Sequence, residues 1–484
     1  MNYKKINRFL SGILILKAVF MIPAMLICIY DKETKVALSF LATIGISIVL
    51  AGILYLFSRN PSNGFHQREG LVCASACWIL ISLVGCLPFF ISRQIPSFID
   101  ALFEIVSGFT TTGASILSDV ESLSRGLLYW RSFSHWLGGM GVLVLLMVFV
   151  PKSDHNSGST MHLLRAESPG PNVGKLVPRM KKTALVLYGI YMAMTILNFI
   201  FLFIGGMPLF DSVCTTFGTA GTGGFGIKSD SMASYSPYLQ NVTTIFMLLF
   251  GINFSCYYLI LTKHLLSVWR DEELRAYLSV FVVSTALITL NIYHLYSNVT
   301  IGLRHAAFQV STVMTTTGFA TTDFDKWPVF SKQLLLCLMF VGASAGSTAG
   351  GLKFQRLLLL LKNLRRHIHR TLYPNKVQVV RMNGQKVSEK ILDGTDLYLI
   401  AYSLILIFSF MLISIDNFSI TTNFSAVVAC FNNVGPGLDA VGPTCNFGGF
   451  SIFSKLVLIF DMLAGRLEIL PLLCTLNIST WKRR

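Results

Sequence analysis

A short run of small or β-branched residues that ends in glycine occurs four times along the chain, and its main chain could coordinate a cation. Two copies are nearly the same, ALFEIVSGFTTTGAS at 101–115 and AAFQVSTVMTTTGFATT at 306–322. Two are weaker, DSVCTTFGTAGTGGFG at 211–226, aligned on Gly223, and NFSAVVACFNNVGPGL at 423–438, aligned on Gly435. Because these glycines lie about a hundred residues apart, the sequence predicts a fourfold repeat of a large unit rather than a solenoid of small ones.

The chemistry of these runs would lie in their carbonyl groups. β-Branched residues hold the chain extended, and glycine permits the positive φ that points successive carbonyl oxygens the same way. Four such runs around one axis would form rings of oxygen that replace the water shell of a cation. The candidate ligands are Thr110, Thr111, Thr112, Gly113, Ala220, Gly221, Thr222, Gly223, Thr315, Thr316, Thr317, Gly318, Asn432, Asn433, Val434 and Gly435. The alternative is that the glycines serve helix packing or turns.

The composition indicates an integral membrane protein. Hydrophobic residues make up 53% of the chain and charged residues 13%, with a mean hydropathy of +0.63, whereas soluble domains carry about 25% charged residues. The net charge of +16 comes from basic residues in short loops between apolar spans, which is typical of the positive-inside rule and not of nucleic-acid binding. The ten cysteines show no metal-binding spacing, so we expect buried reduced thiols.

Spans of about twenty apolar residues must position the four runs. The sequence predicts ten of them, near Phe9–Tyr30, Val36–Phe57, Leu71–Ile91, Phe133–Val150, Ala184–Ile204, Val242–Leu266, Ala276–Leu295, Leu334–Leu361, Leu397–Ile415 and Ile452–Leu473. Four shorter apolar segments precede the runs, at about Ser97–Phe109, Leu209–Thr219, Leu303–Met314 and Asn423–Phe431. A dozen helical residues rise only about 18 Å against a hydrocarbon core of about 30 Å. We therefore expect four re-entrant half-helices.

Basic residues set the expected orientation. With the N-terminus inside, the clusters at 152–182, 263–275, 356–390 and 482–484 all fall inside, and the four runs re-enter from the outer face. We expect six parts along the chain: a helix pair at 1–68, pore repeats at 69–152, 153–266 and 267–366, a basic cytoplasmic loop at 367–392, and a fourth pore repeat at 393–484.

Two further features lie deep in the predicted spans. The run GASAGSTAGG at 342–351 interrupts Leu334–Leu361 with residues that form helices poorly, so the helix should break there; small-residue packing is the alternative. Arg466 lies some fourteen residues into the last span, where a charge is costly unless it faces water or a partner. It is expected to face the pore. A structural salt bridge to Asp461 or Glu468 is the alternative.

Together these residues resemble the TrkH-type subunits of the Trk/Ktr/HKT potassium-transporter superfamily over nearly the whole chain. The matching stretches are SGFTTTGAS, WRSFSHWLGGMGVLVL (Trp130–Leu145), RAESPGP (Arg165–Pro171), FGTAGTGGF, TTTGFATTDF, GASAGSTAGGLKFQR (Gly342–Arg356), FNNVGPGL and AGRLEILPLL (Ala464–Leu473). The resemblance implies an all-α membrane protein in which four helix–pore helix–filter–helix repeats surround one pore. The second and fourth runs depart from Thr-Thr-Thr-Gly, so the ring should be only quasi-fourfold.

The resemblance also implies a function and partners. It implies potassium uptake across the cytoplasmic membrane, by a channel or a symporter, with K⁺ as the transported ion and no prosthetic group. It implies a gate formed by the intramembrane loop and a pore-facing arginine, with the residues Gly342, Gly346, Gly350, Gly351, Lys353 and Arg466. A homodimer with one pore per chain and a cytosolic nucleotide-binding ring of the TrkA kind are the expected partners, besides membrane lipids. The chain itself carries no Walker or dinucleotide motif.

Two other classes of function compete with this interpretation. An alternating-access transporter would show inverted halves and acidic residues deep in the membrane, whereas the four repeats share one orientation and few carboxylates lie deep. A membrane enzyme would need a convergent set of His, Asp and Glu or an activated nucleophile, and the sequence offers neither. We therefore expect no enzymatic activity.

Overall fold

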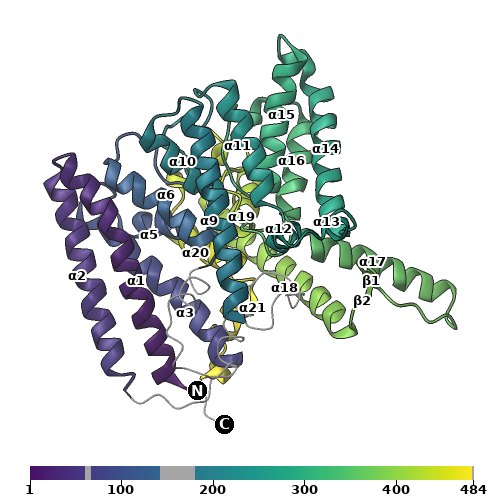
Figure 1. The fold of residues 1–484 in the computed structure, drawn as a ribbon, viewed down its shortest axis with the longest axis horizontal. Helices are drawn as coiled ribbons and strands as arrows, with labels where there is room; N and C mark the ends of the chain where they lie inside the picture. Colours follow the sequence, from purple (N-terminus) through teal and green to yellow (C-terminus); the bar gives the residue numbers. More distant parts are fainter. Residues whose placement is uncertain (60–66, 142–179, 482–484) are drawn as a thin grey trace.

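The computed structural model describes residues 1–59, 67–141 and 180–481, and their structure is almost wholly helical (Figure 1). Six helical segments in these ranges are long and apolar enough to cross a membrane, or seven if one bent pair counts as a span. The six segments consist of α1 (Tyr3–Tyr30), α2 (Thr34–Leu56), α3 (Gln67–Gly85) with α4 (Leu87–Ile91), α9 (Met180–Ile204), α14 (Glu272–Ile292) and α18 (Glu389–Ile413). The chain is a multi-pass membrane protein, as predicted.

All four predicted half-helices are present. They are α5 (Phe98–Phe109), α10 (Leu209–Gly221), α15 (Val299–Met314) and α19 (Ile420–Phe431). Capping residues start three of them, because the side chains of Ser97, Asn298 and Ser419 each accept an N–H of the first turn. Each half-helix follows a long helix along the chain, which confirms the repeated unit of span, half-helix and run.

The second long helix is broken in the second, third and fourth units, while in the first unit the described residues include only α6 (Arg125–Gly139). The broken helices are α11 (Pro237–Phe250) with α12 (Phe254–Leu261), α16 (Val329–Val341) with α17 (Phe354–Leu372), and α20 (Ile452–Arg466) with α21 (Leu470–Leu476). The break between Val341 and Phe354 confirms the prediction for the glycine-rich run. Val242–Leu266 and Ile452–Leu473 were expected as single spans, but α11 and α12 meet at 89° and α20 ends at Arg466.

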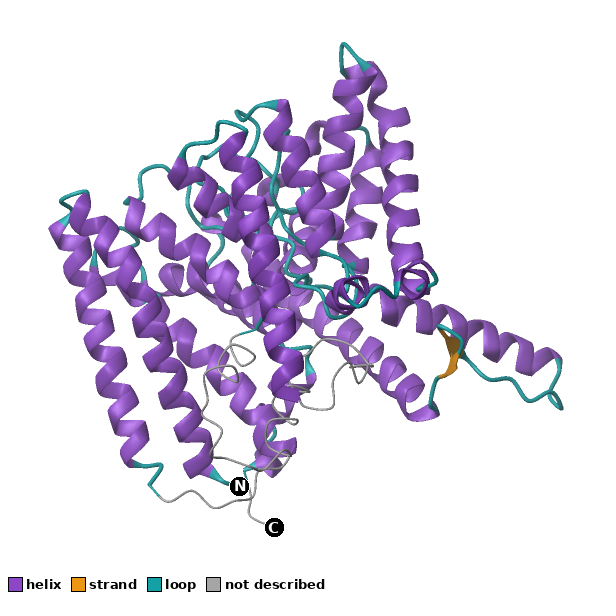
Figure 2. Ribbon diagram, in the orientation of Figure 1, coloured by secondary structure: helices purple, strands orange, loops and turns teal. Residues whose placement is uncertain are grey.

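Some predicted features lie outside the described residues. They are the RAESPGP stretch, the second half of Phe133–Val150, most of the basic cluster at 152–182, and the final basic residues 482–484. The remaining described elements are the short helix α13 (Leu265–Trp269), several 3-10 turns and one hairpin of β1 (Arg381–Met382) and β2 (Gln385–Lys386). Figure 2 shows this hairpin beside α17, where α17 and the start of α18 extend beyond the bundle.

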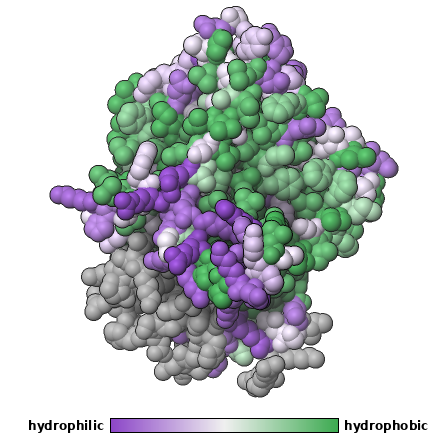
Figure 3. All heavy atoms as spheres, turned by 90° about the vertical axis from the view of Figure 1, so that its right-hand side faces the viewer, coloured by the Kyte–Doolittle hydropathy of each residue, from purple (hydrophilic) through white to green (hydrophobic). Residues whose placement is uncertain are grey.

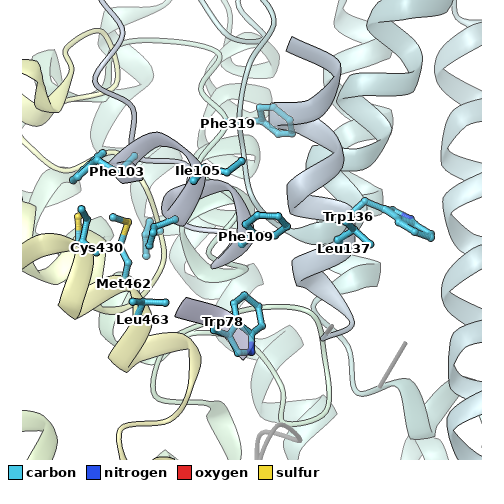
Figure 4. Close-up of a cluster of buried hydrophobic side chains, with 14 of the residues drawn as sticks. Trp78, Phe103, Ile105, Phe109, Trp136, Leu137, Phe319, Cys430, Met462 and Leu463 are labelled. Carbon is cyan, nitrogen blue, oxygen red and sulfur yellow. The ribbon is translucent and has the colours of Figure 1, made fainter. Parts of the chain in front are cut away.

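Large apolar side chains fill the centre of the bundle, between the half-helices and the broken helices. Phe103 and Phe109 of α5 and Trp130 of α6 are almost fully buried. Figure 4 shows Phe109 with Trp78 of α3 and, toward α20, Met462 and Leu463. Apolar residues also cover the outside of the bundle, and Figure 3 shows them over the upper part of one face while hydrophilic residues gather below its middle. An apolar exterior suits contact with lipid tails.

Tyr3 and Trp481, near the two ends of the described chain, lie side by side at the edge of the molecule where the N-terminus is marked (Figure 1). The ring of Tyr3 stacks on that of Trp481 with their centroids 6.4 Å apart. Both termini therefore share one side of the bundle, as the predicted topology requires, while the assignment of that side to the cytoplasm stays a prediction.

Candidate ion filter and gate

Each half-helix ends in the same turn. The residue after its last turn has a left-handed backbone, with φ of 57° at Thr111, 54° at Thr222, 54° at Thr316 and 56° at Asn433. The next N–H bonds back over five residues, from Thr112 to Ser107 (2.9 Å), Gly223 to Gly218 (2.8 Å), Thr317 to Thr312 (2.7 Å) and Val434 to Ala429 (2.8 Å). This is the Schellman geometry. A β-branched residue at positive φ is strained by about 1–2 kcal/mol, so the surrounding structure must enforce it.

A glycine with positive φ follows two residues later in every copy. These glycines are Gly113 (82°), Gly224 (72°), Gly318 (92°) and Gly435 (98°). In the second copy the residue equivalent to Gly113 is therefore Gly224, and not the predicted Gly223. The run equivalent to Thr110–Gly113 becomes Gly221–Gly224, and Ala220 belongs to the last turn of α10. The sequence offers Gly221, Gly223 and Gly224 within four residues, and only backbone geometry decides among them.

The four runs close into one ring. A Cβ on Gly113, Gly224, Gly318 or Gly435 would lie 2.7 Å or less from a carbonyl oxygen of Gly223, Thr317, Val434 or Thr112, respectively. Each glycine thus lies against the run of the next repeat, and the last repeat contacts the first. The four runs surround a common axis in chain order, as the sequence predicted.

Hydrogen bonds between side chains hold the runs together. The hydroxyl of Thr110 lies 2.8 Å from that of Thr112, and Thr315 pairs in the same way with Thr317 at 2.7 Å. The amide of Asn433 donates to the Thr112 hydroxyl at 2.9 Å, which joins the fourth repeat to the first. All of these side chains are fully buried. The hydroxyls of Thr110, Thr112, Thr315 and Thr317 are thus engaged by protein groups, whereas the hydroxyl of Thr111 and the side-chain oxygen of Asn433 are buried without a hydrogen-bond partner among the described residues.

A buried ion pair that the sequence did not suggest connects the first two repeats beyond the filter. Arg131 Nε donates to Glu104 Oε1 at 2.5 Å, and the side chains are 3% and 0% exposed. Glu104 Oε2 also accepts the N–H of Ile116 at 3.0 Å, and Arg131 donates to the Gly226 carbonyl at 2.9 Å. The pair ties together the two extended segments that leave the first and second runs. The overlooked signal was a carboxylate inside the apolar half-helix Phe98–Phe109.

His135 fills the space behind the same two repeats. One ring nitrogen lies 2.8 Å from the carbonyl oxygen of Gly108, at the end of the first half-helix, and the other accepts the Phe225 N–H at 3.3 Å. A Cβ on Gly223 would collide with this ring. His135 therefore fixes the position of the second run from the side away from the axis.

All four ring glycines open into one cavity of about 110 Å³, which also borders Cys445 and Asn446. We call this cavity the vestibule. It lies on the side of the ring where the chain leaves each run.

The glycine-rich segment 342–351, which we call the gating loop, lies on the opposite side of the ring. The N–H of Gly350 donates to the Thr316 hydroxyl at 2.7 Å, and a Cβ at Gly350 would lie 2.6 Å from the Asn432 carbonyl oxygen. The loop therefore touches the third and fourth runs. Gly342 and Gly351 lie against each other, and Gly346 lies against the Asn253 amide.

Two predicted gate residues carry buried or partly buried cationic groups beside this loop. Lys353 is 2% exposed, and its ammonium group donates to the Ala349 carbonyl. The guanidinium group of Arg466 donates to the carbonyls of Thr348 and Gly139 at 2.8 Å each, and to that of Gly138. Arg466 thus connects the gating loop to the end of α6.

The predicted partners of Arg466 bind elsewhere. Asp461 accepts from the Ser409 hydroxyl at 2.7 Å, and Glu468 pairs with Arg356. The bonds just described instead place Arg466 among main-chain carbonyls under the ring. The structure thus brings together the four runs, the gating loop and Arg466, and their roles as filter and gate stay predictions.

Comparison with known proteins agrees with this arrangement. The family model TrkH, described as a cation transport protein, matches residues 37–480. The chain is 35% identical over its full length to the Trk system potassium uptake proteins TrkH of Salmonella typhimurium and Escherichia coli. It matches the crystal structure of the potassium transporter TrkH from Vibrio parahaemolyticus with a TM-score of 0.88 and 30% identity, each chain covered completely. With a family model that spans most of its length and full-length relatives, the chain belongs to the TrkH family of cation transport proteins.

Proposed function

We propose that this protein admits K⁺ into the cell through the ring of runs, down the electrochemical gradient of the ion. The observation that carries the proposal is a closed circle of contacts, in which each ring glycine lies against a carbonyl oxygen of the next repeat. Such a ring offers main-chain oxygens from four sides, which is the arrangement that replaces the hydration shell of K⁺. The ligands are the carbonyls of Thr110–Gly113, Gly221–Gly224, Thr315–Gly318 and Asn432–Gly435.

The half-helices support a cation at this place. Three of them end immediately before their runs and α10 ends at the first residue of its run, so the negative ends of four helix dipoles point toward the axis. The cation thereby gains electrostatic stabilisation without a carboxylate in the ring. The potassium-uptake names of the full-length relatives favour K⁺ as the cargo.

The gate consists of the gating loop and Arg466. The loop touches two runs from the side opposite the vestibule. The Arg466 side chain holds the loop to the end of α6 by donating hydrogen bonds to main-chain carbonyls of both. A guanidinium group in the path repels an approaching cation, so its position sets part of the barrier. Opening requires the loop and Arg466 to move away from the axis.

The protein acts in the cytoplasmic membrane with both termini inside, as a homodimer with two pores, under a cytosolic nucleotide-binding partner. The basic residues of α17 and of the segment that follows it support this orientation. Nucleotide control comes from the partner because the chain has no nucleotide motif. The chain performs no enzymatic reaction and needs no prosthetic group.

The test is rescue of a potassium-uptake-deficient cell at low K⁺, combined with uptake of ⁸⁶Rb⁺ into vesicles that contain the purified protein. We expect both to succeed and K⁺ to compete with Rb⁺ better than Na⁺ does. A carrier for another solute would fail both assays, and a coupled secondary transporter would show flux that requires a second solute.

A further inference from the structure

The hairpin β1–β2 contacts both α14 and α17, the two helices that connect it to the gating loop. Its turn is Asn383-Gly384, with φ of 50° and 77°, which suits the type I′ turn of a two-residue hairpin. Val380, Met382 and Val387 of the hairpin segment are buried with Leu359 of α17 and Leu392 of α18. The hairpin is therefore a packed element and not a loose loop, although its tip is exposed.

Asn383 at the hairpin tip binds the start of α14 through three hydrogen bonds. Its side-chain amide donates to Asp271 Oδ2 at 2.8 Å, and its own N–H donates to Glu272 Oε1 at 3.0 Å. Its side-chain oxygen accepts the N–H of Glu272 at 2.9 Å. Asp271 is the N-cap of α14 and accepts the N–H of Leu274 at 2.9 Å. Asn383 thus fixes the first turn of α14 to the hairpin.

The next residue of α14 holds the gating loop. Glu273 is 4% exposed, and its Oε1 accepts the N–H of Ala345 at 2.6 Å. Ala345 lies inside the gating loop, between Gly342 and Gly350. Neighbouring bonds from the α11–α12 break to the same loop join Ser344 N–H to the Gly251 carbonyl and Phe254 N–H to the Gly346 carbonyl, both at 3.1 Å. Glu273 is thus one of a small set of groups that position the loop.

The hairpin also binds the helix that leaves the gating loop. Lys362 of α17 pairs with Glu272, and its ammonium group donates to the Arg381 carbonyl at 2.8 Å. α17 begins at Phe354, three residues after the loop ends at Gly351. The hairpin is therefore connected to the loop by two routes, through Glu273 to Ala345 and through α17 to Gly351.

We propose that the hairpin is the control point for the gate: Asn383, Asp271 and Glu273 are positioning residues that hold the gating loop under the ring. Displacing the hairpin frees the first turn of α14, and the Glu273 carboxylate then no longer accepts the hydrogen bond from the Ala345 N–H. The side chains of Arg381, Gln385 and Lys386 on the outer face of the hairpin are exposed. This inference rests on the proposed function, because the loop is a gate only if ions pass the ring.

The transport test compares hairpin variants in vesicles with purified protein. Asn383→Ala removes the side-chain bonds to α14, and Asn383→Asp places a carboxylate against that of Asp271. Gln385→Ala, in the exposed strand of the same hairpin, is the matched control. We expect the two Asn383 variants to raise the maximal ⁸⁶Rb⁺ uptake rate at least threefold while the K⁺/Na⁺ preference and the KM for K⁺ stay at the wild-type values, because the ring is untouched.

Glu273 supplies the second arm. Glu273→Gln weakens the bond to Ala345 and should raise the rate as Asn383→Ala does, whereas Glu273→Asp should restore part of the wild-type rate. If both residues act on one path, the double variant Asn383→Ala/Glu273→Gln is no faster than the faster single variant. Wild-type rates in both Asn383 variants, or a selectivity that falls together with the rate change, would overturn the proposal.

Hydrogen exchange separates this inference from the proposed function. The exchange rate of the amides in 342–351 should rise at least threefold in Asn383→Ala and stay unchanged in Gln385→Ala, whether or not the vesicles take up ions. If the wild-type protein carries no Rb⁺, the proposed function fails. If it carries Rb⁺ and loop exchange is the same in all variants, only the hairpin inference fails. Asp271→Asn repeats the measurement from the α14 side if an Asn383 variant does not fold.

Discussion

Substituting one ring glycine should reduce ion selectivity, because the added Cβ atom displaces the carbonyl oxygen that lies against the glycine. Gly113 has φ of 82°, and a Cβ there would overlap the carbonyl oxygen of Gly223. Gly206 offers a matched control, because its φ is 85° but nothing lies within 4 Å of an added Cβ. Gly113→Ala and Gly206→Ala therefore carry the same backbone strain, and only the first disturbs the ring.

The expected magnitude follows from this pair. An alanine at positive φ costs about 1–2 kcal/mol in both variants. At Gly113 the Gly223 carbonyl must also move, because a real Cβ atom almost never lies closer than 3.0 Å to a heavy atom outside its own residue and its chain neighbours. If the displaced ligand removes about 1.4 kcal/mol from the difference in binding between K⁺ and Na⁺, the selectivity ratio falls about tenfold.

The assay is competition of K⁺ and Na⁺ against ⁸⁶Rb⁺ uptake in vesicles that carry equal amounts of folded protein. Gly206→Ala should lower the melting temperature slightly and keep the wild-type ratio. Gly113→Ala should lose about a factor of ten in the ratio. A wild-type ratio in Gly113→Ala would refute the reasoning, because the carbonyl ring would then not be the site that distinguishes the ions.

Three further predictions concern the gate, the buried ion pair and the vestibule. Arg466→Ala should raise the ⁸⁶Rb⁺ uptake rate severalfold and Arg466→Lys much less, since lysine keeps the positive charge; unchanged or reduced uptake at normal expression would contradict the barrier role. Glu104→Gln should lower the melting temperature clearly, because breaking a buried ion pair costs about 3–5 kcal/mol. Replacing both partners, by Glu104→Leu with Arg131→Met, should recover part of the loss. A wild-type melting curve for Glu104→Gln would show that the pair does not hold the segments that leave the runs. A charged thiol reagent applied from the outside should block uptake by reacting at Cys445, which is exposed and borders the vestibule. Block should vanish in Cys445→Ser and persist in Cys337→Ser, and block that persists in Cys445→Ser would show that the reagent acts at another thiol and not at the vestibule.

The sequence was informative where the signal is local. The length of apolar segments separates spans from half-helices, and a run of glycines at membrane depth predicts a broken helix, as seen between Val341 and Phe354. The repetition of the runs predicted a fourfold ring, and the closed contacts of the ring glycines agree with it. These features depend on residues close together in the chain, so hydropathy and backbone preference suffice to find them.

Local signals were insufficient for the breaks in α11–α12 and α20–α21. Both segments have the apolar composition of a continuous span, and their breaks follow from contact with the ring: a Cβ on Gly251 would lie 2.9 Å from Thr315 Cγ2, and a Cβ on Gly465 would collide with the Phe431 carbonyl. The exact register of the second run was likewise ambiguous among neighbouring glycines.

The sequence by itself determined the architecture, a membrane protein of four repeats with one glycine-ended run in each. The lengths of the apolar segments, the positions of the glycines and the repetition of the runs can all be read along a single chain. Only the tertiary structure decided which groups meet, such as Glu104 with Arg131, Arg466 with the carbonyls of Gly139 and Thr348, and Asn383 with Asp271. The physical reason is that a buried charge or amide is satisfied by whichever partner the packing of distant helices brings within hydrogen-bonding distance, and nothing near it in the sequence specifies that partner.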